Sequence, residues 1–177
     1  MTRKKIINKK NLVPDSSWLN FRKVRAIIEN ASGNIVICTE GGVPIFPGGK
    51  CDANENEENA IKREVKEETG IELTDERLNK ALVIESFYDD FYDFRSKKLR
   101  PRHTVTTYFY VKTNKWINKD KIELTDGEKR LGFNIFTVSK NNLYKLLNED
   151  HQGVLNGKFF DEENRIVLNE ILKEKGH

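Results

Sequence analysis

The chain has 177 residues, of which 37% are apolar and 33% charged; this is the composition of a single soluble globular domain, not of a disordered chain. Lysine and arginine number 31 and aspartate and glutamate 28, so the net charge of +3 gives no compositional case for a nucleic-acid partner. No apolar run approaches the roughly 20 residues that a membrane helix needs.

The N-terminus and the cysteines indicate the cellular compartment. Residues 1–10 are basic but lack the apolar run of a signal peptide. Cys38 and Cys51 do not have the spacing of a metal cluster, and two thiols are too few for a disulfide scaffold. We therefore expect a protein of the reducing cytoplasm, with an N-terminal extension over residues 1–20 and one domain over residues 21–177.

The first elements of that domain read as strands. Residues 21–40 predict a hairpin, because two β-rich runs flank a polar turn that contains Gly33, where a positive φ is tolerated. Residues 41–50 predict a short strand that Pro47 interrupts.

A helix is expected next, between Asn56 and Gly70. Asn56 is a good N-cap residue, Glu57 and Glu58 complement the positive end of the helix dipole, and Gly70 suits the left-handed position that ends many helices.

The second half of the chain alternates strands and helices. β-Branched and aromatic residues predict strands over residues 80–91, 102–113 and 131–139, with a basic turn over residues 95–102. Helices are expected over residues 140–149 and 161–175. Hairpin strands mixed with a few helices indicate an α/β or α+β sandwich around one sheet.

The predicted helix after Asn56 concentrates negative charge. Offsets of three and four residues place Glu64, Glu67 and Glu68 on one surface of the helix. Like charges at these offsets destabilise a helix by a few tenths of a kcal/mol each. A divalent cation among the carboxylates reverses that cost, and hard oxygen ligands suit Mg²⁺, with Mn²⁺ as a close substitute. The alternative is a solvated face with Lys62 and Lys66 as partners.

The residues around the glutamates follow a fixed spacing. Reading from the amino end, the pattern is Gly49, five residues, Glu55, seven residues, Arg63-Glu64-Val65, one residue, Glu67-Glu68, one residue, Gly70-Ile71. This pattern resembles the signature of the Nudix hydrolases at each of its nine fixed positions. The order of strands around it is similar to that family too, over roughly residues 20–150.

The resemblance implies a fold and a reaction. The expected fold class is α/β, as an α/β/α sandwich with a mixed sheet. The expected reaction is hydrolysis of a pyrophosphate bond in a nucleoside diphosphate linked to another group, with Mg²⁺ or Mn²⁺ as cofactor. Nucleoside triphosphates, dinucleotides and nucleotide sugars are the implied substrates.

The resemblance also implies roles for residues in the motif. The metal ligands would be Glu64, Glu67, Glu68 and the carbonyl of Gly48. Arg63 would orient a glutamate by bidentate hydrogen bonding, which lysine cannot reproduce. Glu55 would support the loop or bind a further metal.

Residues outside the motif are expected to bind the substrate. Tyr88 and Phe91, in an aromatic segment, are candidates for stacking on a planar group, although core packing is the ordinary role of such residues. Arg102, in the basic turn, is a candidate for contact with a substrate phosphate.

A further acidic residue is expected near the metals, because many members of the family carry one before a late strand. Glu128 is our candidate, with Asp126 and Glu123 behind it, and an ordinary turn glutamate is the alternative. Glu128 would complete the metal site or take a proton from the attacking water.

Three other functions stay open. An RNA 5′-pyrophosphohydrolase would use the basic turn; otherwise we expect no nucleic-acid partner and no membrane partner. A sensor on the same fold would bind a nucleotide conjugate without cleaving it, although no catalytic glutamate is missing here. An isomerase would need further acid–base residues. The chain is expected to be a monomer or a homodimer.

Overall fold

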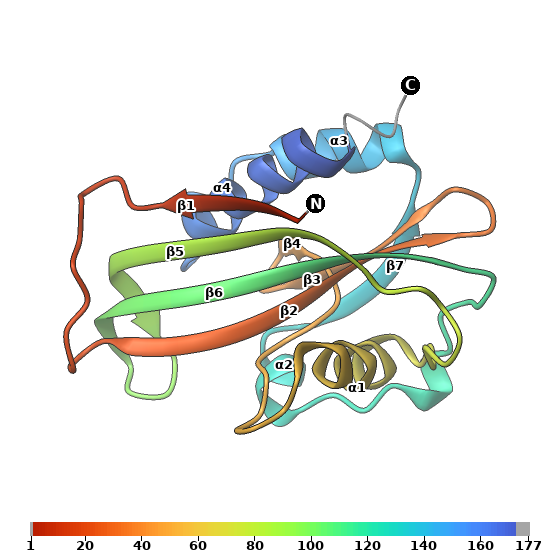
Figure 1. The fold of residues 1–177 in the computed structure, drawn as a ribbon, viewed down its shortest axis with the longest axis horizontal. Coiled ribbons are helices and arrows are strands. Elements are labelled where there is room, and N and C mark those ends of the chain that lie inside the picture. The colour runs from red at the N-terminus through yellow and green to blue at the C-terminus, as the bar shows by residue number, and fades with distance from the viewer. Residues whose placement is uncertain (1, 173–177) are drawn as a thin grey trace.

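The computed structural model describes residues 2–172 and shows a sheet between two layers of helices (Figure 1). The strands are β1 (Arg3–Ile7), β2 (Leu19–Asn30), β3 (Ile35–Glu40), β4 (Val43–Ile45), β5 (Asn79–Asp93), β6 (Lys98–Thr113) and β7 (Asn134–Val138). The helices are α1 (Glu57–Thr69), α2 (Asp126–Arg130), α3 (Lys140–Asn148) and α4 (Gly157–Val167), with a 3-10 turn at Lys119–Lys121 and a π-helical turn at Leu168–Leu172.

Within residues 2–172 the seven strands form one mixed sheet, in the order β1-β5-β6-β2-β3-β4, with β7 paired to β3. β2 and β6 run parallel along their full lengths, from the pair Leu19–Arg102 to the pair Asn30–Thr113. β5 and β6 are antiparallel, and β3 meets β2 only near the turn between them. The mixed sheet confirms the expected fold class.

The two faces of the sheet bury different side chains. Val24, Ala26 and Ile28 of β2 point to the face that α1 covers, where they pack with Ile61 and Val65. Ile27, between them, points to the opposite face, in the core that β5, β6, α3 and α4 share. Figure 1 shows α1 and α2 on one side of the sheet and α3 and α4 on the other. This alternation is the period of two that a strand buried on both faces requires.

The first residues of the chain add an edge strand that the sequence analysis does not assign. β1 pairs with β5 in parallel, from Arg3 opposite Leu82 to Ile7 opposite Ser86. Ile7 is 3% exposed and Ile6 is 61% exposed, so the strand buries one face only. Because the strand is rich in lysine, its alternation of buried and exposed side chains cannot be recognised from the sequence.

Several predicted boundaries differ from the structure, among them those of the basic segment and of the last helix. The basic segment expected as a turn over residues 95–102 is largely strand, because β6 already begins at Lys98. α4 begins four residues before the expected start of the last helix, at Gly157, where an added Cβ would lie 2.1 Å from the carbonyl oxygen of His151. Residues 173–175 of that predicted helix lie outside the described residues.

No helix between residues 2 and 172 is long and apolar enough to cross a membrane.

Candidate active site

Helix α1 has the boundaries that its sequence predicts. The Asn56 side chain accepts a hydrogen bond from the backbone N–H of Asn59 at 2.8 Å and caps the first turn. Gly70 ends the helix with a φ of 69°, in the left-handed region. Ile61 and Val65 are fully buried against the sheet, which fixes the rotation of the helix about its axis. The glutamates therefore lie along the side that faces the loop before α1.

Arg63 holds the acidic side chains of this site in place. Its Nε and Nη2 donate to the two carboxylate oxygens of Glu55 at 3.0 and 2.8 Å, in a bidentate pair. Its Nη1 donates to Glu64 at 2.9 Å and to Glu67 at 3.4 Å. Arg63 thus ties Glu55, in the loop, to two glutamates of the helix, and Glu55 acts here as a support for that loop.

The loop before α1 runs along β2, where β3 diverges from it. The backbone N–H of Val24 donates to the carbonyl of Gly49 at 2.9 Å, and that of Ala26 donates to the carbonyl of Pro47 at 2.7 Å. The loop is therefore anchored to a central strand, although it has no regular structure of its own.

The loop needs glycine at positions 48 and 49 because atoms of other segments approach its backbone closely at both. An added Cβ on Gly48, whose φ is 134°, would lie 2.2 Å from the carbonyl oxygen of Val24. An added Cβ on Gly49 would lie 2.4 Å from a carboxylate oxygen of Glu64. Gly48 lets the loop meet the sheet, and Gly49 leaves room for the Glu64 carboxylate.

Glu68 is buried beside this loop. It is 4% exposed, and its carboxylate accepts a hydrogen bond from the backbone N–H of Gly48 at 2.7 Å. Burial raises the pKa of Glu68 to about 8, with added repulsion from Glu64 and Glu128, while Arg25 and the Gly48 N–H act in the opposite direction. Burial also raises the pKa of Glu64, against the attraction of Arg63.

The donors of this site fit a hard divalent cation. Within residues 2–172, no three carboxylate, histidine or cysteine side chains converge closely enough to hold an ion as they stand, since Arg63 and Gly48 engage the glutamates. Glu64 and Glu68 are both buried, and the charge of Glu64 contributes to the raised pKa of Glu68, a repulsion that a divalent cation would offset. Carboxylate and carbonyl oxygens are the ligands that Mg²⁺ and Mn²⁺ prefer.

Glu128 lies at the start of the short helix α2. Its carboxylate accepts from the backbone N–H and the hydroxyl of Thr125, at 2.6 and 2.8 Å, in a capping box. The Glu128 carboxylate is half-buried, and its charge contributes to the raised pKa of Glu68. Asp126 and Glu123 are exposed, and the backbone N–H of Glu123 donates to the carbonyl of Glu67 at 2.7 Å.

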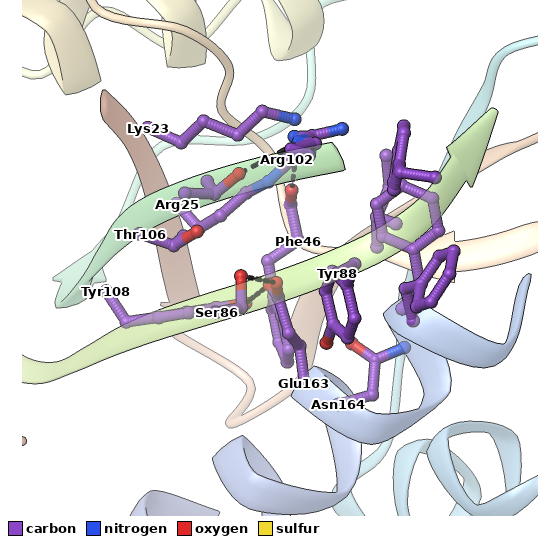
Figure 2. A pocket seen from close by; sticks show the side chains of 15 residues that line it. Lys23, Arg25, Phe46, Ser86, Tyr88, Arg102, Thr106, Tyr108, Glu163 and Asn164 are labelled. Atoms are coloured by element: carbon purple, nitrogen blue, oxygen red, sulfur yellow. Dashed lines mark hydrogen bonds between the residues drawn. The ribbon is translucent and has the colours of Figure 1, made fainter. Parts of the chain in front are cut away.

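The three predicted substrate-binding residues line one pocket on the other face of the sheet, under α4 (Figure 2). Tyr88, Phe91 and Arg102 surround a cavity of about 20 Å³. The guanidinium carbon of Arg102 lies 3.9 Å from the ring centre of Phe91 and 4.8 Å from that of Phe21. Arg102 is therefore stacked between two rings, as a cation–π pair on each side.

Strand β2 contributes pocket residues that the sequence analysis does not single out. Phe21, Lys23 and Arg25 occupy alternate positions of β2 and face α4. Arg25 donates to the carbonyl of Phe46 at 2.8 Å and to that of Gly48. In the sequence, only their spacing of two indicates that they share one face of a strand. Basic residues in a strand usually lie on a solvated face, so the sequence does not predict that they line a pocket. Arg25 and Gly48 connect the pocket to the glutamate helix.

Comparisons with known proteins agree with this geometry. The family described as NUDIX domain matches residues 19–155 of the chain. An 8-oxo-dGTP diphosphatase from Proteus vulgaris is 35% identical over 94 residues, which cover 52% of this chain and 67% of that protein.

Two solved structures show the same fold. The MutT protein of Methanosarcina mazei Go1 is 17% identical, with a TM-score of 0.52 over 85% of this chain and 99% of that one. The dihydroneopterin triphosphate pyrophosphohydrolase of E. coli is 12% identical, with a TM-score of 0.59 over 88% of this chain and 99% of that one.

Proposed function

Since the chain belongs to the NUDIX family, we propose that this pyrophosphohydrolase cleaves nucleoside triphosphates, or another compound of a nucleoside diphosphate, with the help of Mg²⁺. The observation that carries the proposal is the intact network in which Arg63 joins Glu55, Glu64 and Glu67, beside the buried Glu68. The 8-oxo-dGTP diphosphatase activity of the Proteus relative favours a nucleoside triphosphate among the substrates. A nucleotide substrate also fits the expected cytoplasmic location.

The metal would be held by the carboxylates of Glu64, Glu67 and Glu68 and by the carbonyl of Gly48, with Mn²⁺ as a substitute for Mg²⁺. When bound, the ion would offset the charge of the pyrophosphate and make a bound water more acidic. Arg63 would keep Glu64 and Glu67 in position through hydrogen bonds that lysine could not reproduce.

We propose Glu128 as the group that takes a proton from the attacking water or completes the metal site. The contribution of its charge to the raised pKa of Glu68 supports this assignment. The capping contact with Thr125 fixes the side chain without taking up both of its oxygens.

Arg102, Tyr88 and Phe91 are proposed to bind the nucleotide on the α4 face of the sheet. Arg102 and Phe91 also line an adjoining cleft of about 410 Å³, which is large enough for a nucleotide, and a guanidinium there suits a phosphate oxygen. Arg25, which reaches the carbonyl of Gly48, places this pocket next to the metal residues.

An RNA 5′-pyrophosphohydrolase is the second candidate. Arg95, in the β5–β6 hairpin, lines the cleft that leads to the pocket, and Lys97 and Lys98 beside it are exposed. These cations would suit the backbone of an RNA.

A panel of nucleotides separates these functions. Nucleoside triphosphates, dinucleotides, nucleotide sugars and a triphosphorylated RNA would be incubated with and without Mg²⁺ or Mn²⁺, and the products identified by chromatography. Metal-dependent formation of a nucleoside monophosphate supports the proposal, with pyrophosphate as the second product from a triphosphate and the other phosphorylated half as the second product from a conjugate. Cleavage of the RNA alone supports the second candidate. Tight binding of a conjugate with no product after long incubation would indicate a sensor.

A further inference from the structure

Three cations gather on the sheet face beneath α4. Lys23 and Arg25 lie two residues apart on β2, and Arg102 lies on the neighbouring strand β6. Figure 2 shows these three side chains on one side of the pocket, and Glu163 and Asn164 of α4 on the other. Like charges so close to one another require an explanation.

Two of the three cations are engaged by the protein. Arg25 donates to two backbone carbonyls, and Arg102 donates from Nε to the hydroxyl of Thr104 at 2.8 Å while it stacks between Phe21 and Phe91. The ammonium of Lys23 makes no hydrogen bond and no ion pair within residues 2–172. Lys23 is therefore the cation of this group with donors to spare.

The protein compensates this charge only in part. Within the described chain, none of the three cations forms an ion pair with a carboxylate, and Glu40 and Glu163 attract Lys23 from a distance. Glu163 itself accepts from the hydroxyl of Tyr108 at 3.2 Å and lies 3.4 Å from that of Ser86. Burial, with repulsion from Arg102 and Arg25, lowers the pKa of Lys23 to about 7.

The space beside Lys23 is large enough for a ligand. Lys23 and Arg102 line both the inner cavity and an adjoining cleft of about 410 Å³, which reaches Phe21 and the end of β5. In the inner cavity, the hydroxyls of Tyr88 and Thr106 are buried with no hydrogen-bond partner among residues 2–172. Thr106 is the residue opposite Lys23 in the β2–β6 pair. Donors without acceptors thus line the inner end of an open cleft.

We propose that Lys23 is a specificity-determining residue that binds a phosphate group of the nucleotide in this cleft, an inference that rests on the proposed function. A neutral base edge would satisfy hydrogen bonds but leave the positive charge uncompensated, whereas a phosphate supplies both acceptors and charge. The backbone of Lys23 also pairs with that of Lys50, the residue after Gly49 in the loop before α1.

Binding without turnover tests this assignment. Isothermal titration in EDTA would compare dGTP, dGMP and deoxyguanosine for the wild type, Lys23→Met and Lys23→Arg. We expect Lys23→Met to weaken both phosphorylated ligands by about tenfold or more and to leave deoxyguanosine unchanged, because one charged hydrogen bond is lost. Lys23→Arg should keep most of the affinity. Lys145→Met, which removes an exposed lysine of α3 outside the cleft, is the matched control and should change nothing.

The pH dependence supplies a second readout. The charged groups that face Lys23 or line its cleft are Arg25, Glu40, Asp93, Arg95, Arg102 and Glu163. Between pH 7.5 and 9 the phosphates are already ionised, since their last pKa is about 6. Wild-type affinity for dGTP should therefore fall several-fold as Lys23 loses its proton, and Lys23→Arg should show a flat profile.

Stability supplies the third. Removing a poorly compensated half-buried cation should raise the melting temperature of Lys23→Met at pH 7 by about 2–4 °C, whereas loss of a structural lysine would lower it.

The outcomes distinguish a failure of the proposed role of Lys23 from a failure of the proposed hydrolase function. Equal loss of deoxyguanosine binding in Lys23→Met, unchanged binding of all probes, or no binding of any probe by the wild type would overturn the role of Lys23. If no nucleotide is hydrolysed with any metal, yet phosphate-dependent binding still requires Lys23, the hydrolase proposal fails and the binding site stands.

Discussion

Burial of Glu68 favours its neutral form, whereas binding of the proposed metal would need its ionised form. A carboxylate that is 4% exposed costs stability when it is ionised, and its pKa is raised to about 8 mainly by that burial. A divalent cation removes the same cost, because it supplies the missing positive charge. The fold is therefore least stable when Glu68 is ionised, and the ionised form is the one that would bind the proposed metal. Functional groups commonly reduce stability in this way.

The first prediction concerns Glu68→Gln in EDTA. Because the pKa of Glu68 is higher in the folded than in the unfolded chain, its protonation stabilises the fold fully below pH 4.5, and this contribution is lost as pH rises through about 8. We expect the variant to be more stable than the wild type at pH 8, by about 2–4 kcal/mol, and not at pH 5. Urea unfolding at both pH values measures the difference.

In Mg²⁺ the same variant should lose activity by about 10³-fold, because one ligand charge is removed. Equal stability of the two proteins at both pH values, together with near-normal turnover, would show that Glu68 is neither strained nor a ligand.

The second prediction concerns Glu128→Gln. The amide oxygen can still accept from the Thr125 N–H, so the capping box and the stability should survive. Loss of a general base lowers kcat by about 10²–10⁴-fold with little change in KM. Asp126→Asn, an exposed acid in the same helix, is the control and should keep full activity. A kcat within twofold of the wild type would leave Glu128 as a capping residue and make Glu64 the better candidate for the base.

At the scale of elements, the loop before α1 determines the site as much as the helix does. It has no regular structure, yet the carbonyls of Pro47 and Gly49 accept hydrogen bonds from the backbone of β2. Its glycines leave room for the Val24 backbone on one side and the Glu64 carboxylate on the other. Rigid placement of a loop on a central strand is a common way to hold functional groups in position.

The third prediction follows from that loop. Gly49→Ala would place a Cβ 2.4 Å from a carboxylate oxygen of Glu64 and displace that carboxylate. We expect the fold to survive, with kcat reduced about 10²-fold and the Mg²⁺-induced rise in melting temperature lost. Gly153→Ala meets nothing within 4 Å and serves as the control. Normal Mg²⁺ stabilisation of Gly49→Ala would contradict the proposed role of Glu64.

The elements also show what the sequence can and cannot predict. Helix α1 is predictable because Asn56 and Gly70 are local signals and Ile61 and Val65 have helical spacing. The pocket is not, because it joins alternate residues of β2 and β6 with residues of α4, and their register depends on the sheet. The sequence predicts a turn up to Arg102 and a strand from it, yet β6 begins four residues earlier, at Lys98, which pairs with Asp93 across the hairpin.

At the scale of the whole molecule, the edge strand β1 lies on the opposite side of the sheet from the proposed metal site. β1 is the strand at one edge, while the loop before α1 and strands β3 and β4 lie beyond β2. Substitutions at the β1 edge should therefore change the free energy of unfolding without changing the reaction.

The fourth prediction tests this separation with two neighbouring residues. Ile7→Ala, at a buried position, should cost about 2–4 kcal/mol, and Ile6→Ala, at an exposed one, less than about 0.5 kcal/mol. Both variants should keep the wild-type kcat at a temperature where they are folded. Urea unfolding and steady-state kinetics measure the two quantities. Equal costs for both residues would mean that β1 does not pack as described.

The backbone of Gly48 contacts both halves of the proposed site. Its N–H donates to Glu68 of α1, and its carbonyl accepts from Arg25 of the pocket beneath α4. If a bound nucleotide draws Arg25 away, this carbonyl becomes free for the proposed cation. Reciprocity would then require that the nucleotide raise the affinity for Mg²⁺ by the same factor by which Mg²⁺ raises the affinity for the nucleotide. The dissociation constant of either ligand would thus depend on the concentration of the other.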